Sequence, residues 1–139
     1  MADDLVSAIR IASSGLNVQS QRLRVVSENL ANINSTGETA GADAYRRKTI
    51  SFQSVLDSTS GATLVRVSSI GQDSTPFRLE HRPGHSAADE NGYIKLPNVN
   101  ALVEMTDLRE ANRSYQANLQ VVRQSREMVN SLIELMRGR

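Results

Sequence analysis

Apolar residues recur at alternating spacings of four and three along the N-terminal part of the chain. The series runs through Leu5, Ile9, Ala12, Leu16, Gln19, Leu23, Val26, Leu30 and Ile33, and Gln19 is its one polar member. Such a heptad seam predicts a long helix that packs against a second helix. Gly15 is the strong helix weakener inside the series, and Gly37 follows it as a helix stop.

The C-terminal part of the chain repeats this pattern. The series runs through Ala101, Met105, Leu108, Asn112, Tyr115, Leu119, Val122, Arg126, Val129, Ile133 and Met136. Pro97 and Asn98 precede it, as expected at a helix start. A single seam left in water gains little from burial, so an antiparallel hairpin that buries both seams is favoured over two independent helices.

Both predicted helices carry a second apolar stripe. Ile11, Val18 and Val25 lie seven residues apart, and so do Val121, Met128 and Leu135. At 100° per residue each stripe lies about 130° around the helix from the middle of its seam. A hairpin alone would leave both stripes in water. Scattered surface aliphatics are the ordinary explanation, but two stripes in the same register favour an interaction surface.

The middle of the chain loses the heptad and favours short strands. Thr63–Ile70 is β-branched and alternating and is the best strand candidate, and Phe77–Leu79 and Tyr93–Leu96 are further short candidates. Ile50–Leu56 is either a short strand or a helical turn. We therefore predict a mainly α fold, with long N- and C-terminal helices paired as an antiparallel coiled-coil hairpin and a small β-containing insertion. The predicted segments are the N-terminal helix over 1–36, the inserted loop and β element over 37–97, and the C-terminal helix over 98–139.

Composition excludes several classes of function. Aromatic residues make up 4% of the chain, so the chain can bury aliphatic helix faces but is poorly suited to form a thick core. The net charge of +1, from 16 basic and 15 acidic residues, gives no footprint for nucleic acid, and no apolar run suits membrane insertion. The absence of cysteine excludes disulfides. MADDLVSAIR lacks the features of a secretory signal, so we expect any export to use a route without a cleaved signal.

An enzymatic function finds little support in the sequence. His81 and His85 are four residues apart, a spacing that suits a metal site on a helix, but Pro83 and Gly84 lie between them. There is no phosphate loop, no GxSxG and no cysteine nucleophile. We predict no catalytic residue, no cofactor and no metal ligand, and keep a metal-dependent enzyme using the two histidines as a weak alternative.

One segment resembles a known family. Ser14–Gly37, SGLNVQSQRLRVVSENLANINSTG, is similar to the N-terminal signature of the axial proteins that form the rod, hook and filament of the bacterial flagellum. Its core motifs here are Ser14-Gly15-Leu16, Asn29-Leu30-Ala31-Asn32 and Thr36-Gly37. Thr75–Asn100 and Glu104–Val122 resemble the corresponding segments of proximal rod subunits.

The resemblance implies a non-enzymatic structural subunit of the proximal rod, located in the flagellar basal body within the periplasm. It would assemble through its terminal helices, transmit motor torque and be exported by the flagellar type III apparatus. The implied partners are other copies of itself, other proximal rod subunits, distal rod subunits, the adaptor to the MS ring and the export apparatus. A soluble coiled-coil adaptor or chaperone that binds a partner helix stays as the alternative.

The predicted assembly interface combines the two stripes with Gly15, Asn29 and Asn32. A mid-helix glycine suggests close approach by a neighbouring helix. The two amides would be solvated in a monomer, or would hydrogen-bond neighbouring backbones in an assembly, and we favour the second. The predicted seam within the subunit is formed by Leu5, Ile9, Leu16, Leu23, Val26, Leu30, Ile33, Leu108, Tyr115, Leu119, Val122, Val129 and Ile133.

Overall fold

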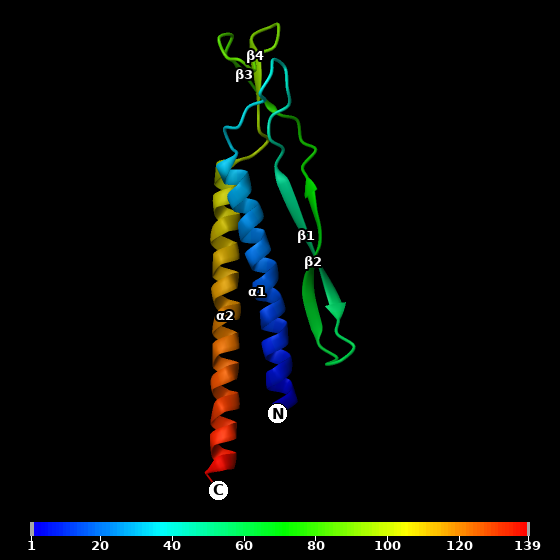
Figure 1. The fold of residues 1–139 in the computed structure, drawn as a ribbon, viewed down its shortest axis with the longest axis vertical. Helices are drawn as coiled ribbons and strands as arrows, with labels where there is room; N and C mark the ends of the chain where they lie inside the picture. Colours follow the sequence, from blue (N-terminus) through cyan, green and yellow to red (C-terminus); the bar gives the residue numbers. More distant parts are fainter. Residues whose placement is uncertain (1, 139) are drawn as a thin grey trace. The chain divides into compact units, whose positions relative to one another are not determined.

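The computed structural model describes residues 2–138; Met1 and Arg139, the outer residues of the two predicted terminal segments, lie outside the described part. Along the chain the elements are α1 (Ala2–Ala31), β1 (Lys48–Leu56), β2 (Thr63–Gln72), β3 (Arg78–His81), β4 (Tyr93–Leu96) and α2 (Ala101–Arg137). The two long terminal helices are in contact, and small antiparallel hairpins lie between them in sequence (Figure 1). The predicted fold class is therefore confirmed.

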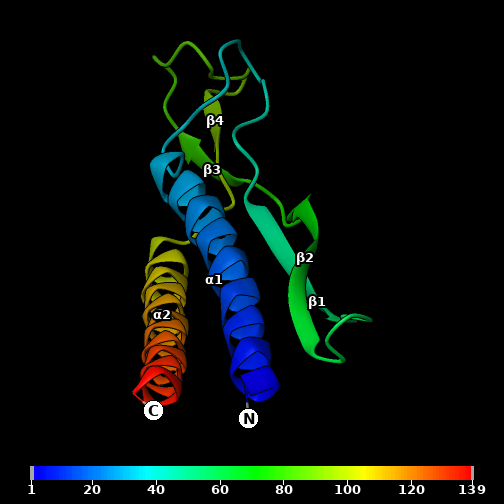
Figure 2. The same ribbon diagram turned by 60° about the horizontal axis from the view of Figure 1, so that its bottom comes forward.

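The described chain divides into two units. The first unit holds α1 up to Leu23, residues 51–69 of the β1–β2 ribbon, and α2 from Glu110 onward. Within it, α1 and α2 run side by side in opposite directions, and the ribbon lies along α1 on the side away from α2 (Figures 1 and 2). The ribbon closes through a turn in which Asp57 N–H donates to Ala62 O and Gly61 adopts a φ of 66°.

The second unit holds the last turns of α1, the first turns of α2 and the β3–β4 hairpin. In this hairpin Leu79 pairs with Lys95 and His81 pairs with Tyr93. Ile94 points to the other face and is fully buried. Because side chains alternate along a strand, this small sheet has one covered face and one exposed face.

Asparagine side chains define both helix ends near the second unit. Asn100 precedes α2, and its Oδ1 accepts from the N–H groups of Leu102 and Val103 at 3.0 and 3.4 Å. These are two of the N-terminal donors that a helix leaves unpaired, so Asn100 rather than Asn98 is the cap. At the other end Asn32 donates from Nδ2 to Glu28 O at 2.9 Å, and α1 ends before Ile33.

The buried face of α2 differs from the predicted seam in one of its two heptad rows. Leu108, Tyr115, Val122 and Val129 are buried or half-buried. In the second row Leu119 is half-buried, as predicted, but Met105, Asn112, Arg126 and Ile133 are exposed, and Ile133 has an exposed fraction of 44%. Ala111, Ser125 and Leu132, which directly precede Asn112, Arg126 and Ile133, are buried or half-buried in their place.

Small residues explain this shift of the seam. Ala111 is fully buried and Ser125 nearly so, and both allow close approach of the facing helix. Gly15 on α1 is equally close to α2, since a Cβ built there would lie 2.7 Å from Asn118 Nδ2. The row of Ala111, Asn118, Ser125 and Leu132 contains one large apolar residue, so the spacing of large apolar residues does not reveal it.

Candidate assembly surface

The N-terminal stripe is mostly covered within the subunit. Val18 and Val25 each have an exposed fraction of 3%, whereas Ile11 is 43% exposed. The prediction that both stripes lie in water is therefore wrong for these two valines. Val18 belongs to the first unit, which contains the β1–β2 ribbon along α1 in addition to the two helices (Figure 2).

Polar contacts hold the ribbon to α1. Val65 N–H donates to Ser14 Oγ at 3.2 Å, and Arg10 Nη1 donates to Asp57 Oδ2 at 2.8 Å. Hydrogen bonds from the Ser60 hydroxyl and the Thr59 N–H, with the Arg10 guanidinium, hold the pKa of Asp57 below its usual value. The carboxylate form of Asp57 is thus favoured in the folded chain.

The C-terminal stripe is exposed along α2. Val121, Met128 and Leu135 have exposed fractions of 44%, 46% and 70%. Exposure of one large aliphatic side chain is ordinary, but three at heptad spacing on one helix form an exposed apolar stripe. Their role in assembly stays a prediction, as does that of Ile11.

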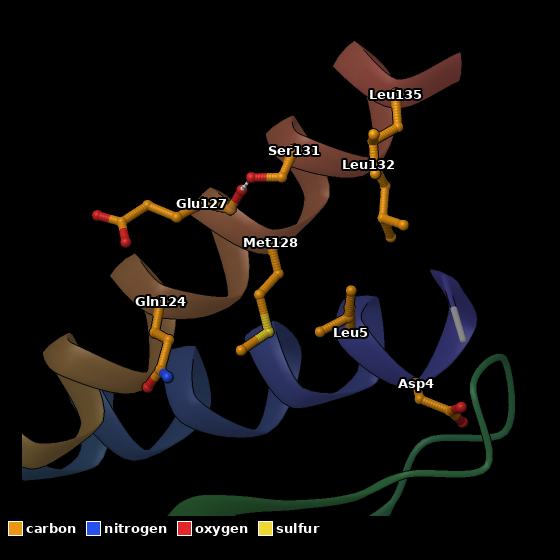
Figure 3. A pocket seen from close by; sticks show the side chains of 8 residues that line it. All are labelled: Asp4, Leu5, Gln124, Glu127, Met128, Ser131, Leu132 and Leu135. Carbon is orange, nitrogen blue, oxygen red and sulfur yellow. Dashed lines mark hydrogen bonds between the residues drawn. The ribbon is translucent and has the colours of Figure 1, made fainter.

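The lower part of this stripe borders a groove at the free ends of the helix pair. Figure 3 shows Leu5 of α1 facing Met128 and Leu132 of α2, with Leu135 one turn further on. The groove has a volume of 620 Å³. Its remaining lining residues are polar or acidic: Asp4, Gln124, Glu127 and Ser131. Sequence reasoning missed these four, although Gln124 and Ser131 continue the heptad spacing of the stripe.

Asn29 lies elsewhere, in a buried polar cluster of the second unit. Its exposed fraction is 1%, and its Oδ1 accepts from Lys48 N–H at 2.8 Å and from the Tyr45 hydroxyl at 2.9 Å. Its Nδ2 donates to Lys48 O at 2.9 Å and to Glu104 Oε2 at 3.1 Å. All four hydrogen-bonding positions of the amide are used within the chain. The prediction that Asn29 is available to a neighbouring subunit is therefore wrong.

Glu104 is the other centre of this cluster, and its side chain is fully buried. Arg47 Nε donates to Glu104 Oε1, and the same guanidinium lies 3.8 Å from carboxylate oxygens of both Asp73 and Asp107. Arg47 N–H donates to Asn98 Oδ1 at 2.8 Å. Burial of the Tyr45 ring is the main cause that raises the pKa of its hydroxyl, so Tyr45 stays a donor. The cluster ties the end of α1, the start of β1 and the start of α2 together.

Two further candidates also have partners inside the chain. Gly15 faces Asn118 of the same subunit, so the close approach inferred from this glycine is made by α2. Asn32 is half-buried; its Nδ2 bonds Glu28 O and its Oδ1 accepts from the Ser35 hydroxyl at 3.0 Å. Asn32 therefore closes the end of its own helix.

The two histidines do not form a metal site in the described part of the chain. His81 packs edge-on against Tyr93 at 5.0 Å between ring centroids, and His85 Nδ1 accepts from Ala87 N–H at 3.1 Å. No group of three or more potential ligands occurs among residues 2–138. Among the same residues, neither helix has the length and apolarity needed to cross a membrane.

Comparisons with known proteins agree with the fold. Residues 9–37 match the family model described as flagella basal body rod protein, and residues 90–135 match that described as flagellar basal body rod FlgEFG protein C-terminal. The flagellar basal-body rod protein FlgC of Agrobacterium fabrum is 58% identical to the chain, over 98% of each. The FlgC proteins of Borreliella burgdorferi and Salmonella typhimurium are each 38% identical, over 96% and 94% of this chain and 99% and 97% of their own lengths.

These relatives cover nearly the whole chain at 38–58% identity, and the matched family models include most of both terminal helices. The family is structural and non-enzymatic, which excludes the metal-dependent enzyme. Its place is the rod of the flagellar basal body. The chain belongs to the FlgC family of flagellar basal-body rod proteins.

Proposed function

We propose that this rod subunit assembles through its terminal helices with copies of itself and with other proximal rod subunits, and contacts the distal rod and the adaptor to the MS ring. In this position it transmits motor torque through the periplasm. It reaches the rod through the flagellar type III export apparatus. The observation that carries the proposal is the exposed apolar face of α2 in a chain of the rod family.

The burial of the two stripes supports α2 as the main assembly helix. Val18 and Val25 are covered within the chain, but Val121, Met128 and Leu135 are not. A face of this kind gains about 25 cal/mol for each Å² of apolar surface removed from water. Assembly of subunits into a rod would remove this apolar surface of α2 from water.

Replacement of Val121 tests this proposal, because Val121 belongs to the exposed stripe and does not line the groove. In a strain that lacks the native gene, Val121→Asp should sharply reduce the number of subunits in purified basal bodies and the motility. A carboxylate brought unpaired into an apolar contact costs several kcal/mol. Val121→Ser removes the apolar contact alone and should weaken assembly less.

Export is measured separately in the same strains, as the amount of subunit in the periplasm and the culture medium. Both variants should be exported at the level of the unsubstituted chain, since the exposed residue is not needed before assembly. Normal incorporation of Val121→Asp would show that this face of α2 lies in solvent within the rod, and the proposed assembly through α2 would fail.

A further inference from the structure

We propose that Met128 is an oxidation-sensitive site: hydrogen peroxide converts its thioether to a sulfoxide, and the oxidised subunit is excluded from the rod until the sulfoxide is reduced. This inference rests on the proposed function, because the sulfoxide acts through the exposed stripe of α2. Its support comes from the solvent access of Met128, from the apolar side chains around it and from the absence of cysteine in the chain.

An oxidant in water can reach Met128 in the unassembled subunit. Its side chain is 46% exposed, and it lines the groove between α1 and α2. The chain has four methionines and no cysteine, so methionine thioethers are its only sulfur groups. No thiol of the chain competes for a peroxide that meets this subunit, and the exposed thioethers are its targets.

The oxidation of Met128 needs no reactant besides the peroxide. The sulfur gives an electron pair to one oxygen of hydrogen peroxide, an S–O bond forms and the O–O bond breaks. The proton of the transferred hydroxyl passes to the leaving hydroxide, which departs as water. The sulfur is oxidised by two electrons and the peroxide is reduced. Methionine sulfoxide reductases reverse this change, so the site can return to its apolar form.

The side chains around Met128 are largely apolar, so a sulfoxide changes the character of this surface. Figure 3 shows the Met128 side chain pointing from α2 toward Leu5 of α1, with Leu132 nearby on α2. Val121 and Leu135 continue the exposed stripe seven residues before and after it. Oxidation places a polar oxygen in the middle of this stripe, in place of a flexible apolar thioether.

The sulfoxide oxygen is tolerated in the free subunit but not in an apolar contact. In the free subunit water can hydrogen-bond it, because the side chain is exposed. A contact that removes this water leaves few donors. The Ser131 hydroxyl already donates to Glu127 O at 3.0 Å, and the Gln124 amide is the other side-chain donor of the groove lining. A polar group buried without its hydrogen bond destabilises the contact, so the oxidised subunit keeps its fold but does not assemble.

Met105 provides a matched control on the same helix. It is 47% exposed, so peroxide has equal access to it. It belongs to the second unit and lies outside the heptad spacing of the stripe. Peroxide should therefore oxidise both methionines, but only the sulfoxide at Met128 should reduce incorporation.

The experiment is a competition inside one cell. The unsubstituted chain and Met128→Leu are induced together during exposure to hydrogen peroxide, in a strain that lacks the native gene and methionine sulfoxide reductase. Leu has nearly the volume of Met, so the two chains should be incorporated equally without peroxide. Mass spectrometry of peptides that span position 128 gives the ratio of the two chains and the sulfoxide fraction, both in basal bodies and in the unassembled periplasmic pool. Peroxide damage to other proteins affects both chains alike.

With about nine-tenths of Met128 oxidised in the pool, Met128→Leu should be enriched about tenfold in basal bodies, because only the unoxidised fraction of the competing chain can assemble. In a parallel competition with Met105→Leu, neither chain should be enriched. The proposal is overturned if oxidised and unoxidised Met128 are incorporated equally, if Met128 stays unoxidised while Met105 is oxidised, or if Met105→Leu gains the same advantage. Normal incorporation of Val121→Asp would overturn the proposed function. Exclusion of Val121→Asp with normal incorporation of oxidised Met128 would overturn this inference alone.

Discussion

From the buried ion pair of Glu104 and Arg47 we predict that removing Arg47 lowers the free energy of unfolding more than removing Glu104. The Glu104 carboxylate is fully buried, and Arg47 is the cation that bonds it. The Arg47 side chain is 22% exposed and has two further carboxylates, of Asp73 and Asp107, at 3.8 Å. Loss of Arg47 therefore leaves the buried Glu104 carboxylate without a cation. Loss of Glu104 leaves the Arg47 guanidinium beside two other carboxylates and in contact with water.

The magnitudes follow from this asymmetry. Arg47→Met should lower the free energy of unfolding by about 3–5 kcal/mol, the cost of breaking a buried pair and leaving one charge uncompensated. Glu104→Leu should cost about 1–3 kcal/mol, mainly because Asn29 Nδ2 loses one of its two acceptors while buried. The double variant Arg47→Met/Glu104→Leu should be more stable than Arg47→Met alone, since no buried charge remains in it.

Urea denaturation of the purified chain, followed by circular dichroism, measures these differences. Glu110→Leu is the matched control, because Glu110 is 64% exposed and lies 3.9 Å from Arg22; its effect should stay within about 0.5 kcal/mol. The reasoning is refuted if Arg47→Met costs no more than Glu104→Leu, or if the double variant is as unstable as the sum of the two single variants.

Two other predictions concern residues of α1. Gly15→Leu should destabilise the helix pair strongly and Gly15→Ala mildly. The added Cβ of Ala would meet only the movable side-chain amide of Asn118, whereas a Leu side chain would also collide with α2 itself. Thermal melts of both variants measure the difference, and equal melting temperatures would contradict it. Gln19→Leu should raise the free energy of unfolding by about 1 kcal/mol or more, because Gln19 Oε1 is buried and accepts no hydrogen bond from any described residue. Urea denaturation measures the change, and a lower unfolding midpoint than that of the unsubstituted chain would show that this amide stabilises the fold.

Local patterns predicted the elements of this fold well. Tyr93–Leu96 was expected as a strand and is β4 with the same bounds, and Thr63–Ile70 lies within β2. Both segments have residues whose chemistry favours strands irrespective of their neighbours. The two terminal helices were predicted for the same reason, because their heptads repeat over many turns.

The contacts of individual side chains could not be predicted in this way. Asn29 bonds Tyr45, Lys48 and Glu104, which lie 16, 19 and 75 residues away in the sequence. No spacing rule connects residues so far apart, so its amide looked available to a neighbour. The same limit applies to Gly15, whose close neighbour Asn118 comes from the opposite end of the chain.

The two apolar stripes have the same spacing in the sequence but differ in burial in the folded chain. Ile11, Val18 and Val25 have the same heptad spacing as Val121, Met128 and Leu135, and the sequence offers no reason to treat them differently. In the folded chain Val18 and Val25 are buried, and the α2 stripe stays exposed. A carboxylate at Val18 would therefore test whether the subunit folds, whereas a carboxylate at Val121 tests whether it assembles.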